Sequence, residues 1–166
     1  MTVMHSLAPD LTVDRVRQLF NPTSIVLVGA TDKSSWSRAF FNNLVQSDFS
    51  GPVHLVNPRG VEVHGQASYA TVAEIPEPVD LAIVMVPTGA VLSVMEEIAD
   101  AGIRSAVVLT SGFGEVGEEG ALLEERLRQL AIERDITVLG PNGNGYVNVA
   151  AGIMPYGLPL SDDIPT

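Results

Sequence analysis

The chain has 166 residues, a formal net charge of −11, 46% apolar residues and no cysteine. This length supports a single domain with a sizeable core. Without cysteine, disulfides, thiolate metal sites and cysteine nucleophiles are excluded. An acidic surface disfavours nucleic acid, because phosphate backbones require basic contacts. We find neither a secretory signal nor an apolar run near the roughly 20 residues of a membrane span. We therefore expect a cytoplasmic protein.

Five short apolar runs recur along the chain and predict five strands. They are Ile25–Val28, Val53–Val56, Leu81–Val86, Ala106–Leu109 and Thr137–Leu139. The runs are continuous rather than alternating, which is typical of strands covered on both faces. Helical patterns lie between most of them. The order predicts an α/β fold, a Rossmann-type doubly wound sheet of about five parallel strands with helices on both faces.

Helices are expected before the first strand and after the first, third and fourth strands. The first helix spans Val13–Phe20 and ends at Asn21-Pro22. Ser37 and Thr88 are the expected N-caps of the next two helices. Apolar residues at helical spacing between 123 and 131 predict the last one.

We divide the chain into a domain and a short C-terminal segment. Residues 1–150 form the domain, with an N-terminal helix at 12–20. Residues 151–166 contain three prolines and are interpreted as an extended tail, or as a linker to a following domain.

In an open α/β sheet, ligands bind beyond the carboxyl ends of the strands. Five loops are predicted to meet there, at residues 29–36, 57–60, 87–88, 110–116 and 140–148. They are rich in Gly, Ser, Thr and Asn, which present backbone N–H groups and hydroxyls. The basic residues Lys33, Arg38 and Arg59 follow the first two strands, while the acidic residues gather elsewhere. This asymmetry predicts a local site for phosphate.

The first loop is placed where a helix N-terminus accepts phosphate, because it follows a strand and opens a helix. It reads Gly29-Ala30-Thr31-Asp32-Lys33-Ser34-Ser35-Trp36-Ser37-Arg38. Thr31 and Ser34 stand where G-x-G-x-x-G has its second and third glycines, which disfavours a pyrophosphate bound in the NAD manner. A plain turn with Ser/Thr capping is the alternative. This loop alone leaves both interpretations open.

The second loop separates the cofactor classes better. NAD-binding domains place Asp or Glu near the end of the second strand, to hold a ribose diol. Here that strand ends in Asn57-Pro58-Arg59, and Glu62 is the next carboxylate. A guanidinium at this place suits a ligand phosphate. The alternative is a solvated surface arginine.

Several motifs resemble, in order, those of the CoA-binding domain of succinyl-CoA synthetase-like enzymes. They are Asn57-Pro58-Arg59, Val86-Pro87, Ser111-Gly112-Phe113-Gly114-Glu115 and Gly140-Pro141-Asn142. The chain is most similar to the ADP-forming acyl-CoA synthetases (acetate–CoA ligases), over about Phe20 to Asn148. The resemblance implies a module that binds coenzyme A and is not catalytic alone. In that family an acyl phosphate and a phosphohistidine form on following ligase and ATP-grasp domains, which would also hold ATP or ADP and Mg.

The resemblance also implies which residues contact coenzyme A, and it implies no metal site. The first loop would cradle phosphates, Arg59 would pair with the 3′-phospho-ADP part, and later motifs would line the path of the pantetheine and thiol. The implied residues are Gly29, Thr31, Lys33, Ser34, Ser35, Ser37, Arg38, Asn57, Pro58, Arg59, Val86, Pro87, Thr88, Ser111, Gly112, Phe113, Glu115, Pro141 and Asn142. Gly143 departs from the family, where a cysteine is common.

Other interpretations remain for the chain and for single residues. The alternatives to a ligase module are a CoA-sensing regulatory module, for example of a protein acetyltransferase, and an NAD(P)-binding oxidoreductase or redox-sensor domain. Gly112 and Gly114 would serve only a turn, and Glu115 only the dipole of the following helix. His5, His54 and His64 match no motif, and we interpret them as surface or strand-edge residues.

Overall fold

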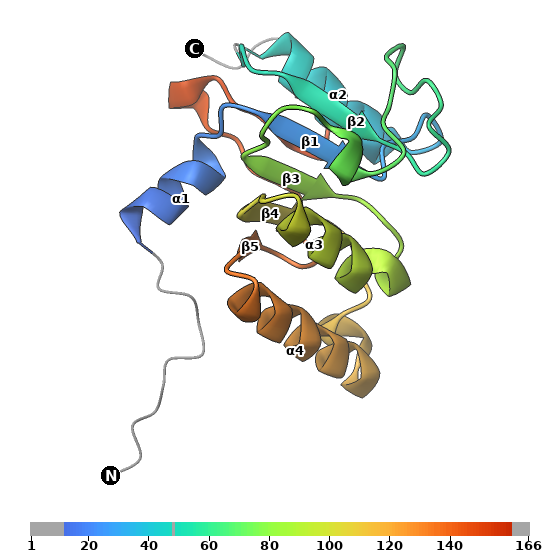
Figure 1. The fold of residues 1–166 in the computed structure, drawn as a ribbon, viewed down its shortest axis with the longest axis vertical. Helices are drawn as coiled ribbons and strands as arrows, with labels where there is room; N and C mark the ends of the chain where they lie inside the picture. Colours follow the sequence, from blue (N-terminus) through green and yellow to red (C-terminus); the bar gives the residue numbers. More distant parts are fainter. Residues whose placement is uncertain (1–11, 48, 161–166) are drawn as a thin grey trace.

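In the part of the chain that the structure describes, five parallel strands form a single sheet in the order β2-β1-β3-β4-β5 (Figure 1). The computed structural model describes residues 12–47 and 49–160. The strands are β1 (Ile25–Val28), β2 (Val53–Val56), β3 (Leu81–Val84), β4 (Ser105–Val108) and β5 (Thr137–Leu139). The predicted α/β class, with about five parallel strands, is confirmed.

Three of the five strands have the predicted bounds, and two are shifted. β3 ends at Val84 rather than Val86, and β4 runs one residue earlier than expected. Beyond Val84 the chain leaves the ladder for contacts between loops: the Val86 carbonyl accepts a hydrogen bond from Thr110 Oγ1 at 2.7 Å. The apolar run Leu81–Val86 is therefore longer than β3, because its last two residues belong to the loop that follows the strand.

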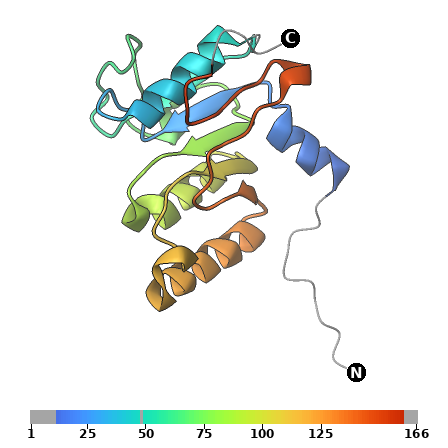
Figure 2. The same ribbon diagram turned by 180° about the vertical axis from the view of Figure 1, so that it is seen from behind.

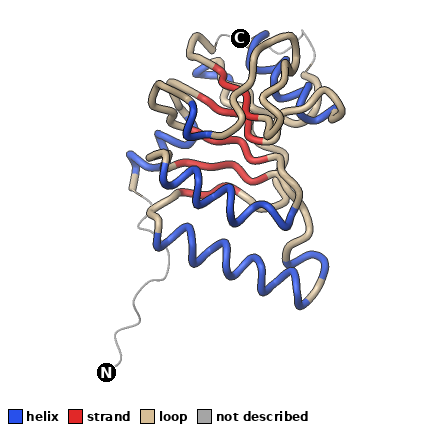
Figure 3. The backbone as a smooth tube through the Cα atoms, turned by 45° about the vertical axis from the view of Figure 1, so that its right-hand side comes forward, coloured by secondary structure: helices blue, strands red, loops and turns tan. Residues whose placement is uncertain are grey.

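Helices cover both faces of the sheet, as predicted. They are α1 (Val13–Phe20), α2 (Ser35–Gln46), α3 (Val91–Asp100) and α4 (Glu118–Glu133). α3 and α4 run side by side along one face (Figure 3). α2 and the C-terminal segment lie on the other face, seen from behind in Figure 2.

Strand side chains alternate between two buried clusters. Val26 and Val28 point into the core under α3 and α4, whereas Ile25 and Leu27 pack with the aromatic face of α2. Because both sides of β1 are buried, the strand shows a continuous apolar run in sequence. This explains why period-two patterning was invisible while the strands themselves were predictable.

Both predicted helix caps within the domain were wrong. Ser34 caps α2, because its side chain accepts from the Ser37 N–H at 3.3 Å, and Ser37 lies buried in the first turn. A short 3₁₀ turn, η2 (Thr88–Ala90), precedes α3. The Thr88 hydroxyl donates to the Ser111 carbonyl at 2.8 Å instead of capping the helix. By contrast, α1 has its predicted bounds and is capped by Thr12.

The segment after β5 folds back across the α2 face of the sheet (Figure 2). The buried Asn43 amide on α2 donates to the carbonyls of Tyr156 and Leu158, each at 2.8 Å. Ile153 is buried in the same layer. The division of the chain at residue 150 stays a prediction. None of the helices in the described part of the chain is long and apolar enough to cross a membrane.

Candidate functional site

The carboxyl ends of the five strands carry a continuous row of loops, which we call the rim. β1 lies between β2 and β3, so the chain leaves β1 for one neighbour and then crosses back to the other. Such a reversal of strand order is where open α/β sheets bind ligands. The switch point lies between the loop after β1 and the loop after β3.

Hydrogen bonds join neighbouring loops of the rim. The Asn57 amide after β2 donates to the Ala30 carbonyl after β1 at 2.8 Å. Farther along, the Thr88 hydroxyl bonds the Ser111 carbonyl at 2.8 Å, and the Asn142 N–H donates to the Thr110 carbonyl at 3.0 Å. The prediction that these loops share one edge of the sheet is confirmed.

The β1–α2 loop, residues 29–34, begins with a glycine that no other residue can replace without strain. Gly29 has φ of +88°, and a Cβ there would lie 2.7 Å from the Met85 carbonyl oxygen. Its N–H and that of Ala30 both donate to the Val56 carbonyl at 3.0 Å. The loop is therefore held close against the ends of both β2 and β3.

The N-terminus of α2 offers two free donors at this point. Within the described residues, the backbone N–H groups of Ser35 and Trp36 have no acceptor. The Ser37 N–H donates to Ser34 Oγ in the cap, the Ser34 N–H donates to the Thr31 carbonyl at 3.4 Å, and the Thr31 hydroxyl accepts from the Lys33 N–H at 3.3 Å. Free N–H groups at the positive end of a helix dipole attract an anion.

The predicted basic residues lie at this part of the rim with different partners. Lys33 and Arg59 are exposed, and their side chains form no ion pair within the described residues. Arg38 pairs with Asp32 at 3.1 Å. Arg59 follows the exposed Pro58 in the turn after β2, where its N–H donates to Asn57 Oδ1 at 3.0 Å.

The other predicted residues, in the loops after β3, β4 and β5, differ in how exposed they are. Val86 and Thr88 are half-buried beside the exposed Pro87. Ser111 is exposed and Gly112 has φ of +100°, but Phe113 is fully buried in the core under α3 and α4. Pro141 follows a cis peptide bond, and Asn142 is exposed with φ of +57°. Only Phe113 among these is a core residue.

The Glu115 side chain forms hydrogen bonds within its own loop, the one after β4. Its carboxylate accepts from the N–H groups of Gly112 at 2.5 Å and Phe113 at 3.1 Å. The bond from the Gly112 N–H is the main reason that the pKa of Glu115 lies below its ordinary value. In the described structure this carboxylate therefore contacts its own loop and is charged.

His64, which matches no motif in the sequence, lies beneath the β1–α2 loop. Its side chain is 1% exposed, which corrects our interpretation of it as a surface residue. Nε2 lies 2.8 Å from Ser37 Oγ, and Nδ1 lies 3.0 Å from Asp32 Oδ1. His54 does lie on the edge strand β2, as expected, and His5 lies outside the described residues.

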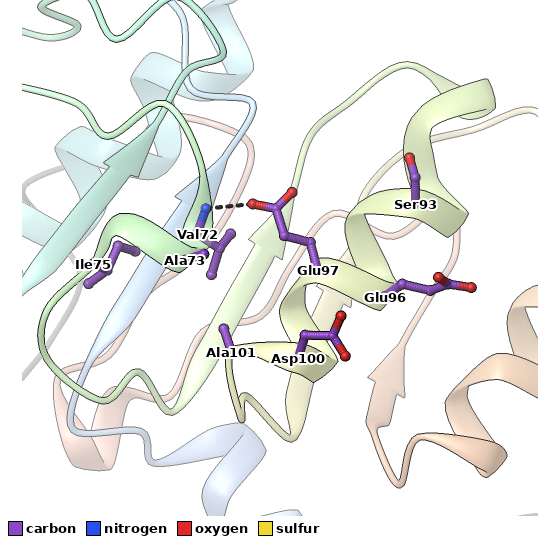
Figure 4. Close-up of a pocket in the computed structure, with 8 residues that line it drawn as sticks. All are labelled: Val72, Ala73, Ile75, Ser93, Glu96, Glu97, Asp100 and Ala101. Carbon is purple, nitrogen blue, oxygen red and sulfur yellow. Dashed lines mark hydrogen bonds between the residues drawn. The ribbon is translucent and has the colours of Figure 1, made fainter.

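A pocket of about 530 Å³ lies elsewhere, between α3 and the 3₁₀ turn η1 (Val72–Glu74) (Figure 4). Glu96, Glu97 and Asp100 line it, and Glu97 accepts the Val72 N–H at 2.7 Å. Its acidic lining repels phosphates. None of the predicted ligand contacts lies in it.

A family model described as "CoA binding domain" matches residues 23–148. An ADP-forming acetate–CoA ligase II of Archaeoglobus fulgidus is 37% identical over 148 residues, which cover 87% of this chain and 22% of the relative. The alpha subunit of the ADP-forming acetate–CoA ligase I of Pyrococcus furiosus is 37% identical over 138 residues, covering 80% of this chain and 30% of the subunit.

Solved structures show the same similarity. The dinucleotide forming acetyl-coenzyme A synthetase 1 of Candidatus Korarchaeum cryptofilum, in complex with phosphate and ADP, matches with a TM-score of 0.80 and 39% identity. The match covers 87% of this chain and 31% of that one. PH0766 from Pyrococcus horikoshii matches with a TM-score of 0.81 and 32% identity, covering 88% and 34%. The chain thus spans about a third or less of the length of these relatives.

Proposed function

The chain belongs to the CoA-binding domain family, and from this premise we propose that it is the coenzyme A-binding module of an ADP-forming acyl-CoA synthetase. In the whole enzyme, acid, ATP and coenzyme A would give acyl-CoA, ADP and phosphate. This module would hold coenzyme A, while the phosphohistidine chemistry, ATP or ADP and Mg would belong to ligase and ATP-grasp domains or subunits. We expect such an enzyme in the cytoplasm.

The end of β2 carries this proposal. Asn57 stands where an NAD-binding domain needs a carboxylate for the ribose diol, and its amide is committed to the Ala30 carbonyl. The exposed guanidinium of Arg59 follows within the same turn. A cation in place of an anion suits a ligand with an additional phosphate on its ribose, such as coenzyme A.

The neighbouring loop supports the same ligand. Ser35 and Trp36 supply unpaired N–H groups at the start of α2, and Lys33 adds a cation beside them. A pyrophosphate at this helix end would receive two backbone donors and the favourable end of the dipole. The three groups offset the repulsion that an anion meets from a chain of net charge −11.

The curated relatives above are CoA ligases, which favours a ligase module over a regulatory domain or a nicotinamide-binding domain. The test is calorimetry of the purified chain with coenzyme A, dephospho-CoA and NAD. We expect coenzyme A to bind most tightly, dephospho-CoA more weakly, and NAD with little affinity. NAD binding as tight as that of coenzyme A would refute the proposal.

A further inference from the structure

His64 occupies an unusual place in the connection from β2 to β3. Its backbone is left-handed, with φ of +54°, and its ring stacks on Phe41 of α2 with centroids 5.2 Å apart and an interplanar angle of 26°. The side chain is 1% exposed. It therefore lies under the β1–α2 loop, where it contacts the loop without reaching a ligand on the rim.

The donors and acceptors around the ring determine which ring nitrogen carries the proton. Asp32 Oδ1 lies 3.0 Å from Nδ1 and also accepts the His64 backbone N–H at 3.2 Å. A carboxylate only accepts, so the proton must be on Nδ1. In the neutral ring Nε2 then accepts the Ser37 hydroxyl at 2.8 Å, and Ser37 Oγ accepts the Thr31 N–H at 2.9 Å. Each group in this chain of bonds has one consistent role.

The charges around the ring agree with a neutral imidazole. Burial is the main cause that lowers the pKa of His64. The Asp32 carboxylate opposes this, and the Arg38 guanidinium adds to it. The backbone N–H of His64 is also the main reason that the pKa of Asp32 is lowered, so this carboxylate is ionised.

The same three residue types make up a nucleophilic triad, but the geometry excludes that chemistry here. Ser37 is 1% exposed, and its oxygen already accepts the Thr31 N–H. A substrate carbonyl has no approach to Oγ. The network is built to hold the loop and not to attack a ligand.

We infer that His64 is a positioning residue for the β1–α2 loop, acting as the neutral Nδ1–H tautomer through Asp32 and Ser37. The inference rests on the proposed function, because the loop is the proposed phosphate site. His64 keeps the Thr31 N–H turned inward and holds the Asp32 carboxylate at the loop's edge. Without the ring, Asp32 loses the Nδ1–H donor and keeps the His64 backbone N–H and Arg38. Its carboxylate is then less well held and less compensated, and it opposes a phosphate at the N-terminus of α2 more strongly.

Three variants separate this role from general damage to the fold. His64→Ala removes both hydrogen bonds of the ring and its stacking on Phe41. His64→Asn keeps an N–H for Asp32 and accepts a left-handed backbone readily, but it loses the acceptor for Ser37. His54→Gln, on the edge strand β2, is the matched control because no hydrogen bond joins His54 to the loop among the described residues.

Two measurements on the full chain decide the matter. Nitrogen NMR of ¹⁵N-histidine-labelled protein without ligand should show His64 with its proton on Nδ1 and a ring pKa below about 6.5. Calorimetry should show coenzyme A binding weakened about tenfold in His64→Ala, less in His64→Asn, and not in His54→Gln. Circular dichroism and thermal unfolding would establish that each variant is folded.

The outcomes distinguish the two proposals. If the wild-type chain does not bind coenzyme A, the proposed function fails, while the tautomer is still determined in the ligand-free protein. If the wild type binds and folded His64→Ala binds equally well, the positioning role is wrong. A proton on Nε2 would also overturn it, because the bond to Asp32 would then have no donor in the ring.

Discussion

The Asn57 side chain joins two loops at once, donating to the Ala30 carbonyl at 2.8 Å and accepting the Arg59 N–H at 3.0 Å. The first bond ties the end of β2 to the loop after β1, and the second shapes the turn that carries Arg59. An amide is required for both, because one partner is an acceptor and the other is a donor.

Asn57→Asp should therefore destabilise the fold, although it only replaces the NH2 group of the side chain by an oxygen. The carboxylate keeps the bond from the Arg59 N–H but faces the Ala30 carbonyl with no proton to donate. We expect the free energy of unfolding to fall by about 1–3 kcal/mol, measured by urea denaturation. Asn42→Asp, an exposed site on α2, is the control for the added charge. Equal stability of the two variants would show that the bond to Ala30 contributes nothing.

The sequence predicted the sheet well because the strands are buried on both faces. Runs such as Ile25–Val28 need no knowledge of partners to be recognised. The prediction of the N-cap of α2 was wrong for a local reason. Ser34, Ser35 and Ser37 can all cap a helix, and only the packing of α2 decides which of them turns inward.

The role of His64 was not predictable for a different reason. Its partners, Asp32 and Ser37, lie 32 and 27 residues away along the chain. The residue belongs to an irregular connection with no periodic pattern, and its backbone there is left-handed. Neither spacing nor composition carries that information. The assignment of ligand contacts to the rim residues stays a prediction.

The chain by itself should have no acyl-CoA synthetase activity in either direction. The side chains of His54 and His64 are only 11% and 1% exposed, which leaves little access for a phosphoryl donor. Incubation with radiolabelled ATP, acid and coenzyme A should yield neither labelled protein nor thioester. A stable phosphohistidine on His5, His54 or His64 would contradict this. Addition of the partner domains from a relative is the positive control.

Glu115 should make stability depend on pH in the acid range. Its pKa is lowered in the folded chain, mainly by the Gly112 N–H. The stabilisation is therefore present above the unfolded pKa of about 4.3 and is lost as pH falls through the lower folded value. We expect Glu115→Gln to melt below the wild type at pH 7, with the difference shrinking toward pH 2. Glu133→Gln, at the exposed end of α4, should show no such trend. A difference that is constant with pH would mean that the carboxylate charge is irrelevant.

Arg59 gives the sharpest test of which ligand the rim accepts. Its guanidinium is exposed in the turn after β2 and forms no ion pair within the described residues. A charge-assisted hydrogen bond to phosphate contributes about 1.5–3 kcal/mol. Arg59→Ala should thus weaken coenzyme A binding about ten- to a hundredfold, and it should affect pantetheine far less. The free energy of unfolding should barely change, because the side chain leaves no buried partner behind.

Arg126→Ala, at an exposed site on α4, removes the same charge away from the rim and should leave affinity unchanged. Unaltered affinity in Arg59→Ala would make Arg59 a solvated surface charge, and the argument from the end of β2 against a nicotinamide cofactor would then depend only on the missing carboxylate.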